Sequence, residues 1–132
     1  MKKLITQAHG MAKSKGFWDE ERNKSELLML IVSELAEALE ALRKDHYADE
    51  DAVKELYHDI EVNLWDDEYN IMEGPWKAGF EANIKSSFED EIADVAIRLF
   101  DLCGGLGIDL EKHIELKMMY NSMRGYKHGK KF

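Results

Sequence analysis

The sequence has a single cysteine, Cys103, and a single proline, Pro75, among 132 residues. One cysteine excludes an intrachain disulfide, so nothing indicates an oxidising compartment. No stretch approaches the roughly 18 apolar residues that a membrane span requires. Residues 1–16 also lack the continuous apolar segment of a signal peptide. We therefore expect a soluble, cytoplasmic protein with no membrane contact.

The chain as a whole also lacks a net positive charge. Its formal net charge is −9, which argues against nucleic-acid binding, because such binding needs a basic surface. Residues 112–132 are the exception, with six lysines and arginines and one acid, Glu115. An acidic body with a basic end is compatible with two readings: a cation and its anionic ligand held together, or a solvated surface.

Linkers, internal repeats and sustained strand alternation are absent, and helical patterns take their place. The strongest runs over Asn23–Lys44, where Asn23 can cap a segment that is apolar nearly all round. The second runs over about Ser87–Cys103, with Ser86 or Ser87 as its cap. We expect the Gly104-Gly105 pair to end it.

Three further segments have weaker helical patterns. One begins at Asp109 as its cap and runs to about residue 123, and the others cover residues 2–13 and 52–64. Residues 65–85, with Gly74-Pro75 in the middle, predict an irregular connection. Together the patterns predict a single all-α domain over residues 1–132.

Two pairs of carboxylates stand out in the two strong helices. Glu34 and Glu37 are three residues apart, as are Glu91 and Asp94, so each pair shares one helical face. If the helices pack together, all four side chains could meet at one point. Each close pair would then repel by roughly 3 kcal/mol at an effective dielectric near 20. A bound cation would offset this repulsion, and oxygen ligands favour Mg²⁺ or Mn²⁺ over zinc.

The alternative is that these carboxylates form a solvated stripe, as most such pairs do. Two observations favour a site instead. Both pairs lie in the most apolar helices, where a solvated face is narrow. In addition, Arg98 and Asp101 continue the line of Asp94 at i+4 and i+7, as in a buried polar seam.

A family resemblance then gives the pattern a chemistry. The segments ELLMLIVSELAEALEALRK and FEDEIADVAIRLFDLCGGLGIDL resemble the MazG-like nucleotide pyrophosphohydrolases of the all-alpha NTP pyrophosphatase superfamily. The signature of that family is E-x-x-E on one helix and E-x-x-D on the next. The segments GFWDEERN and KMMYNSMRGYKHGKKF are similar to one of its subgroups.

The resemblance implies a helical bundle completed by oligomerisation, as a homodimer or homotetramer. It also implies hydrolysis of a nucleoside triphosphate, preferably a dNTP, to the monophosphate and pyrophosphate. A metal-activated water would attack the α-phosphate. The Mg²⁺ ligands, with Mn²⁺ as a substitute, would be Glu34, Glu37, Glu91 and Asp94.

The same resemblance nominates residues for the substrate. Each of these residues can also be explained by structure alone, as part of a solvated basic tail, as a helix C-cap or as a core tryptophan. The candidates are Lys117, Arg124, Lys127 and Lys130 for the phosphates, Asn121 for the sugar or base, and Trp18 as a platform for the base.

The chain departs from the family in one respect. Between Glu37 and Glu91 lie 53 residues, where the family has a short connection. Residues 46–85 are therefore expected to be an insertion that caps the pocket, extends an interface or selects substrate. The general base stays open between members of the carboxylate cluster and Glu40.

Two alternative functions are also suggested by helices of this kind. A ferritin-like di-iron bundle needs two E-x-x-H motifs, and only Glu55 and His58 form one. The other alternative is a non-catalytic helical oligomerisation or interaction module, in which the carboxylates are solvated and the apolar helices form a dimer core. Such a module would release no pyrophosphate.

Overall fold

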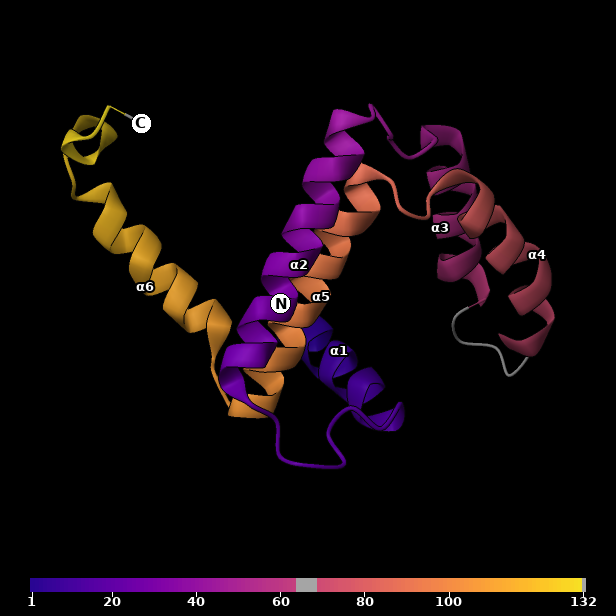
Figure 1. Ribbon diagram of the computed structural model, residues 1–132, viewed down its shortest axis with the longest axis horizontal. Coiled ribbons are helices and arrows are strands. Elements are labelled where there is room, and N and C mark those ends of the chain that lie inside the picture. Colours follow the sequence, from indigo (N-terminus) through magenta and orange to yellow (C-terminus); the bar gives the residue numbers. More distant parts are fainter. Residues whose placement is uncertain (64–68, 132) are drawn as a thin grey trace. The chain divides into compact units, whose positions relative to one another are not determined.

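The computed structural model describes residues 1–63 and 69–131, and over these residues it contains helices and no strand (Figure 1). The prediction of an all-α protein is confirmed. The elements are α1 (Lys2–Ser14), α2 (Lys24–Arg43), α3 (Glu50–Asn63), α4 (Tyr69–Asn83), α5 (Phe88–Leu106), α6 (Leu110–Ser122) and the 3₁₀ helix η1 (Tyr126–Gly129).

The chain divides into two compact units. Unit 1 comprises Met1–Arg22 and Ile97–Phe132, with α1, the end of α5, α6 and η1. Unit 2 comprises Asn23–Ala96, with α2, α3, α4 and the start of α5. None of the described helices has the length and apolar character needed to cross a bilayer.

Local capping determines where the major helices begin, as the sequence predicted. Asn23 Oδ1 accepts hydrogen bonds from the backbone N–H groups of Ser25 (2.8 Å) and Glu26 (3.2 Å) at the start of α2. Ser87 Oγ accepts from the N–H of Asp90 at 3.2 Å in α5, and Asp109 Oδ1 caps α6. Each side chain satisfies N–H groups that the helix itself leaves without partners.

The expectation that Gly104-Gly105 would end α5 is wrong, because the helix continues to Leu106. Tertiary packing in unit 1 explains the two glycines instead. A Cβ at Gly104 would lie 2.6 Å from the Cβ of His9, and one at Gly105 would overlap the Trp18 ring. The glycines are therefore there to let His9 and Trp18 approach the helix backbone closely.

The expectation of an irregular connection over residues 65–85 is also wrong for residues 69–83. Residues 69–83 form α4, with Pro75 inside the helix, and residues 65–68 lie outside the described part of the chain. Packing against α3 offsets the cost of the proline. Trp76 donates its indole N–H to the Leu56 carbonyl at 3.1 Å and stacks on Phe80, and Gly79 lies against Leu56.

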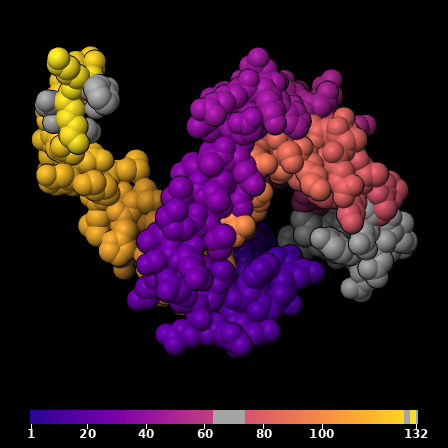
Figure 2. Space-filling view, in the orientation of Figure 1, coloured from indigo at the N-terminus to yellow at the C-terminus, as the bar shows by residue number. Residues whose placement is uncertain are grey.

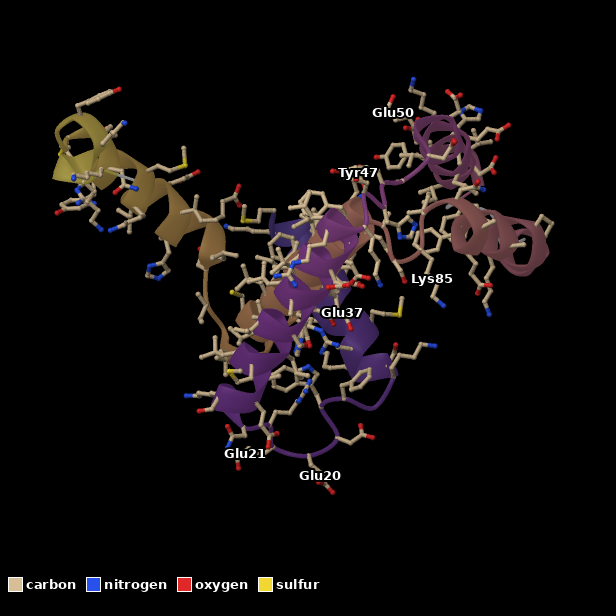
Figure 3. The ribbon with its side chains drawn as sticks, turned by 45° about the horizontal axis from the view of Figure 1, so that its top comes forward. Glu20, Glu21, Glu37, Tyr47, Glu50 and Lys85 are labelled. Atoms are coloured by element: carbon tan, nitrogen blue, oxygen red, sulfur yellow. The ribbon has the colours of Figure 1, made fainter. Side chains whose placement is uncertain are left out.

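The α3–α4 hairpin leaves and rejoins the rest of unit 2 at nearly the same place. The N–H of Asp49 donates to the Asn83 carbonyl at 3.0 Å, which joins the two ends of the hairpin. The N–H of Phe88 donates to the His46 carbonyl at 2.8 Å, which ties the start of α5 to the end of α2. Figure 3 labels Tyr47 and Lys85 near these two ends. Within unit 2, the start of α5 therefore lies antiparallel beside α2 (Figure 1).

Helix α2 is less buried than its apolar sequence suggests. Its buried residues are Leu27, Glu34, Ala38 and Ala41, which share one face. Its other faces expose large apolar side chains, including Leu28 (55% exposed) and Met29 (62% exposed). In Figure 2 the purple atoms of α2 lie at the surface. A single copy of the chain therefore leaves much of this helix uncovered.

The glycine packing predicts a stability difference. Gly105→Ala should lower the free energy of unfolding by about 1–3 kcal/mol, because the new Cβ forces the Trp18 ring to move. Gly10→Ala in α1 is the matched control, since a Cβ there meets no atom within 4 Å. The control should be neutral or stabilise the helix by up to about 1 kcal/mol. Thermal melts of the two variants measure the difference, and equal melting temperatures would contradict the packing argument.

Candidate metal centre

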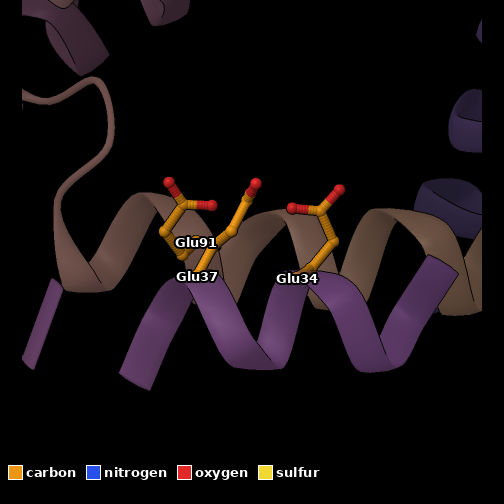
Figure 4. A group of neighbouring side chains, drawn as sticks. All are labelled: Glu34, Glu37 and Glu91. Atoms are coloured by element: carbon orange, nitrogen blue, oxygen red, sulfur yellow. The ribbon is translucent and has the colours of Figure 1, made fainter. Parts of the chain in front are cut away.

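The structure brings together three of the four predicted metal ligands, all within unit 2. One carboxylate oxygen each from Glu34, Glu37 and Glu91 lies within 4.8 Å of the other two. Glu34 and Glu37 come from α2 and Glu91 from the first turn of α5. Figure 4 shows the three side chains reaching the same side of the two helices. The spacing of three in α2 puts its two carboxylates on one face, and packing adds the third.

Two of the three carboxylates are removed from solvent. Glu34 is 7% exposed and Glu91 is 8% exposed, whereas Glu37 is exposed. Glu34 lies on the buried face of α2 with Ala38 and Ala41, whose small side chains leave room for a neighbouring helix. A buried carboxylate costs free energy unless it is protonated, paired or bound to a cation.

The electrostatics of the cluster show this cost at Glu91. Burial raises the pKa of the Glu91 carboxyl from its ordinary value of 4.5 to about 7. The Glu37 carboxylate adds to the rise through its charge and a hydrogen bond, and the charges of Asp94 and Asp90 add further. In the absence of a cation, the cluster therefore keeps a proton near neutral pH.

The donor set and its dimensions fit a hard divalent cation. All three donors are carboxylate oxygens, which suit Mg²⁺ and Mn²⁺ rather than zinc. Glu34, Glu37 and Glu91 each offer one oxygen within 4.8 Å of the other two, so modest side-chain movements would let the three hold one such ion. Because Glu37 is exposed to solvent, the other coordination positions of a bound cation would be accessible to water or a phosphate oxygen.

Asp94, the fourth predicted ligand, lies outside the group of three. It follows Glu91 by three residues in α5, is half-buried, and contributes charge at Glu91. Glu40, a candidate general base, lies one turn beyond Glu37 on α2. Its carboxylate is half-exposed and forms ion pairs with Arg43 (3.7 Å) and Lys44 (3.6 Å).

The predicted phosphate-binding residues belong to unit 1. Lys117 is exposed on α6, where its ammonium lies 4.9 Å from the centre of the Tyr120 ring. The Arg124 guanidinium, just beyond α6, lies 5.8 Å from the same ring. Lys127 is in η1 and Lys130 follows it, and both are exposed. These cations are solvated, as an anion-binding group must be before its ligand arrives.

The alternative that Asn121 is a helix C-cap is wrong, because Met123 is the C-cap of α6. Its Oδ1 is buried and has no hydrogen-bond partner among the residues that the structure describes.

Trp18 is half-buried, and its indole N–H donates to Asp101 Oδ1 at 2.8 Å. His9 Nδ1 lies 2.9 Å from the same oxygen, and its ring meets Trp18 edge to face at 5.0 Å. Sequence reasoning assigned no role to His9 and placed Asp101 only in a polar seam. The available signal was the pair of glycines that follows Asp101, since small residues let aromatic rings approach a helix.

Comparison with known proteins finds no matching family model, no similar curated protein and no similar solved structure. The geometry of the site therefore carries the functional argument.

The raised pKa of Glu91 predicts how stability depends on pH in EDTA. The folded protein keeps the Glu91 proton up to about pH 7, whereas the unfolded chain releases it near 4.5. The folded form thus binds more protons in this window, so stability should fall as pH rises through it. Glu91→Gln should flatten that fall. Saturating Mg²⁺ should abolish it in the wild type, because ligation requires ionised carboxylates.

Melting temperatures between about pH 5 and pH 8, with EDTA or Mg²⁺, measure the effect. Glu21→Gln, at an exposed carboxylate outside the cluster (Figure 3), is the control and should behave as the wild type. Identical pH profiles for Glu91→Gln and wild type in EDTA would contradict the burial of an uncompensated carboxyl.

Proposed function

We propose that this chain is a Mg²⁺-dependent nucleoside triphosphate pyrophosphohydrolase of the MazG-like type, acting in the cytoplasm. Its products are a nucleoside monophosphate and pyrophosphate, and a dNTP is the preferred substrate. One observation carries the proposal: three carboxylates from two helices, separated by a long insertion in sequence, have oxygens within 4.8 Å of one another.

The cluster supports this chemistry because three carboxylates so close together favour the binding of a cation. Glu34, Glu37 and Glu91 would hold the ion, with Asp94 completing the set after a side-chain adjustment. When bound, Mg²⁺ polarises the α-phosphate, neutralises charge on the triphosphate and lowers the pKa of a ligated water. Phosphoryl transfer needs mainly positioning and charge neutralisation, which explains why no cysteine or serine nucleophile is required.

The remaining residues bind and orient the nucleotide. Lys117, Arg124, Lys127 and Lys130 would contact the phosphates, where the guanidinium of Arg124 can bind two oxygens at once. Asn121 Oδ1, which has no hydrogen-bond partner among the described residues, would accept a hydrogen bond from the sugar or base. Trp18 would stack on the base.

The attacking water must also give up a proton to a carboxylate. Glu37 is the exposed member of the cluster, and Glu40 follows it by one turn outside the group of three. Either could accept the proton, and their variants separate the two roles because only Glu37 also belongs to the metal cluster.

Pyrophosphate release tests the reaction directly. The wild type should release pyrophosphate from at least one of the common NTPs and dNTPs with Mg²⁺ and none with EDTA. Glu37→Gln and Asp94→Asn should lower kcat at least a hundredfold while the helical circular dichroism is kept. Glu40→Gln should bind Mg²⁺ normally and lose activity only if Glu40 is the general base.

A contrary result would favour the interaction-module alternative, which has its own support in the exposed apolar side chains of α2 and α6. Under that alternative, no nucleotide yields pyrophosphate. Mg²⁺ then leaves the melting temperature unchanged, whereas a specifically bound ion raises it.

Oligomerisation belongs to the proposal as well. Large apolar side chains remain exposed on α2, as described, and on α6, where Leu116, Met119 and Met123 are 61–75% exposed. Exposed apolar surface on this scale is typical of an interface between subunits. A homodimer or homotetramer would cover it.

Light scattering at micromolar concentration should therefore give a mass at least twice 15.3 kDa. Replacing exposed apolar residues by lysine, as in Met29→Lys with Leu28→Lys, should shift the protein toward the monomer. Glu26→Lys, a polar position at the start of the same helix, is the control. A wild type that sizes as a clean monomer would contradict the proposal.

A further inference from the structure

We propose that Asp101 is a positioning residue for the nucleobase, acting through Trp18. This inference rests on the proposed function and adds to it a residue whose role is to fix the orientation of the indole before the nucleotide binds. The carboxylate of Asp101 itself would not touch the substrate.

Asp101 is a buried acceptor for two aromatic donors. It is 9% exposed, and its Oδ1 accepts from the Trp18 indole N–H at 2.8 Å. His9 Nδ1 lies 2.9 Å from the same oxygen and must carry the proton there, because an ionised carboxylate only accepts. Charge-assisted hydrogen bonds of this length are stronger than neutral ones. One oxygen thus fixes two rings.

Several further contacts restrict the Trp18 ring to a single orientation. The His9 ring meets it edge to face, with centroids 5.0 Å apart and planes at 81°. The Arg22 guanidinium lies 5.6 Å from the ring centre. Gly105 removes the side chain that would otherwise occupy the place of the ring. Trp18 as a whole residue is half-buried despite these contacts.

The ring needs such support because Trp18 lies in a turn between α1 and α2 rather than in a helix. A side chain in a turn that is free to rotate loses that freedom when a base stacks on it, and this weakens binding. An indole already held by Asp101 does not incur that loss. A purely structural clip would make the same two hydrogen bonds, and the nucleotide KM and monophosphate affinity distinguish the two roles.

The test separates positioning from structure by a double-mutant cycle. Asp101→Asn keeps the shape but removes the charge that strengthens both hydrogen bonds. It should raise the KM for the nucleotide about threefold to tenfold, with kcat changed by less than about twofold. The half-saturating Mg²⁺ concentration should not change, because Asp101 is not in the carboxylate cluster. In a Trp18→Ala background the same substitution should have no further effect on KM.

A second variant covers the case in which Asp101→Asn does not fold. Trp18→Phe leaves Asp101 in place and removes only the indole donor and part of the ring, and it too should raise KM with little change in kcat. Tryptophan fluorescence during titration with deoxynucleoside monophosphates gives a readout independent of turnover. The wild type should show a larger signal change at lower ligand concentration than Asp101→Asn.

The outcomes distinguish this inference from the proposed function. A wild type that releases pyrophosphate, with KM and monophosphate affinity unchanged in Asp101→Asn, overturns the positioning role alone. An equal rise in KM with or without Trp18 also overturns it, because Asp101 would then act by another route. A wild type that hydrolyses no nucleotide overturns the proposed function and this inference together.

Discussion

Mutual repulsion among the carboxylates of α2 and α5 is the energetic cost that the packing of unit 2 has to accommodate. Glu34 and Glu91 are buried, and Glu37 lies beside them with an oxygen within 4.8 Å of each. Burial disfavours the charged form of every such group, and close approach adds to the cost. The raised pKa of Glu91 is the direct consequence. Protonation of Glu91 relieves part of this cost, and the three oxygen donors could also hold a divalent cation.

The long segment between the carboxylates of α2 and Glu91 of α5 is compatible with their close approach because the ends of the segment meet. Backbone hydrogen bonds join Asp49 to Asn83 and His46 to Phe88, so the chain returns to α5 close to where it left α2. The entropic cost of closing a loop grows only slowly with its length, and the hairpin offsets part of it through its own packing around Leu56 and Trp76. The hairpin is therefore an addition to the α2–α5 pair rather than an interruption of it.

Unit 1 has a second polar cluster, which consists of Asp101, His9 and Trp18. Here the buried carboxylate accepts hydrogen bonds from two aromatic rings, whereas in unit 2 three carboxylates lie beside one another. The same helix, α5, thus carries carboxylates in two different electrostatic environments. Burial, with neighbouring acids, raises the pKa of Glu91, whereas neighbouring donors give Asp101 two hydrogen bonds. The chemistry of each carboxylate follows from what surrounds it and not from its helix.

The sequence by itself determined the features that depend on neighbours within one or two helical turns. These are the helical class, the caps at Asn23, Ser87 and Asp109, and the pairing of Glu34 with Glu37 on one face. Prediction from the sequence failed where contacts between distant residues decide the secondary structure. Helix α5 continues through Gly104-Gly105, and α4 forms around Pro75. Local propensity penalises both segments by amounts that tertiary packing can exceed. Only the tertiary structure brought Glu91 to the α2 pair and joined Asp101 to partners 92 and 83 residues away, because such contacts leave no periodic trace in the chain.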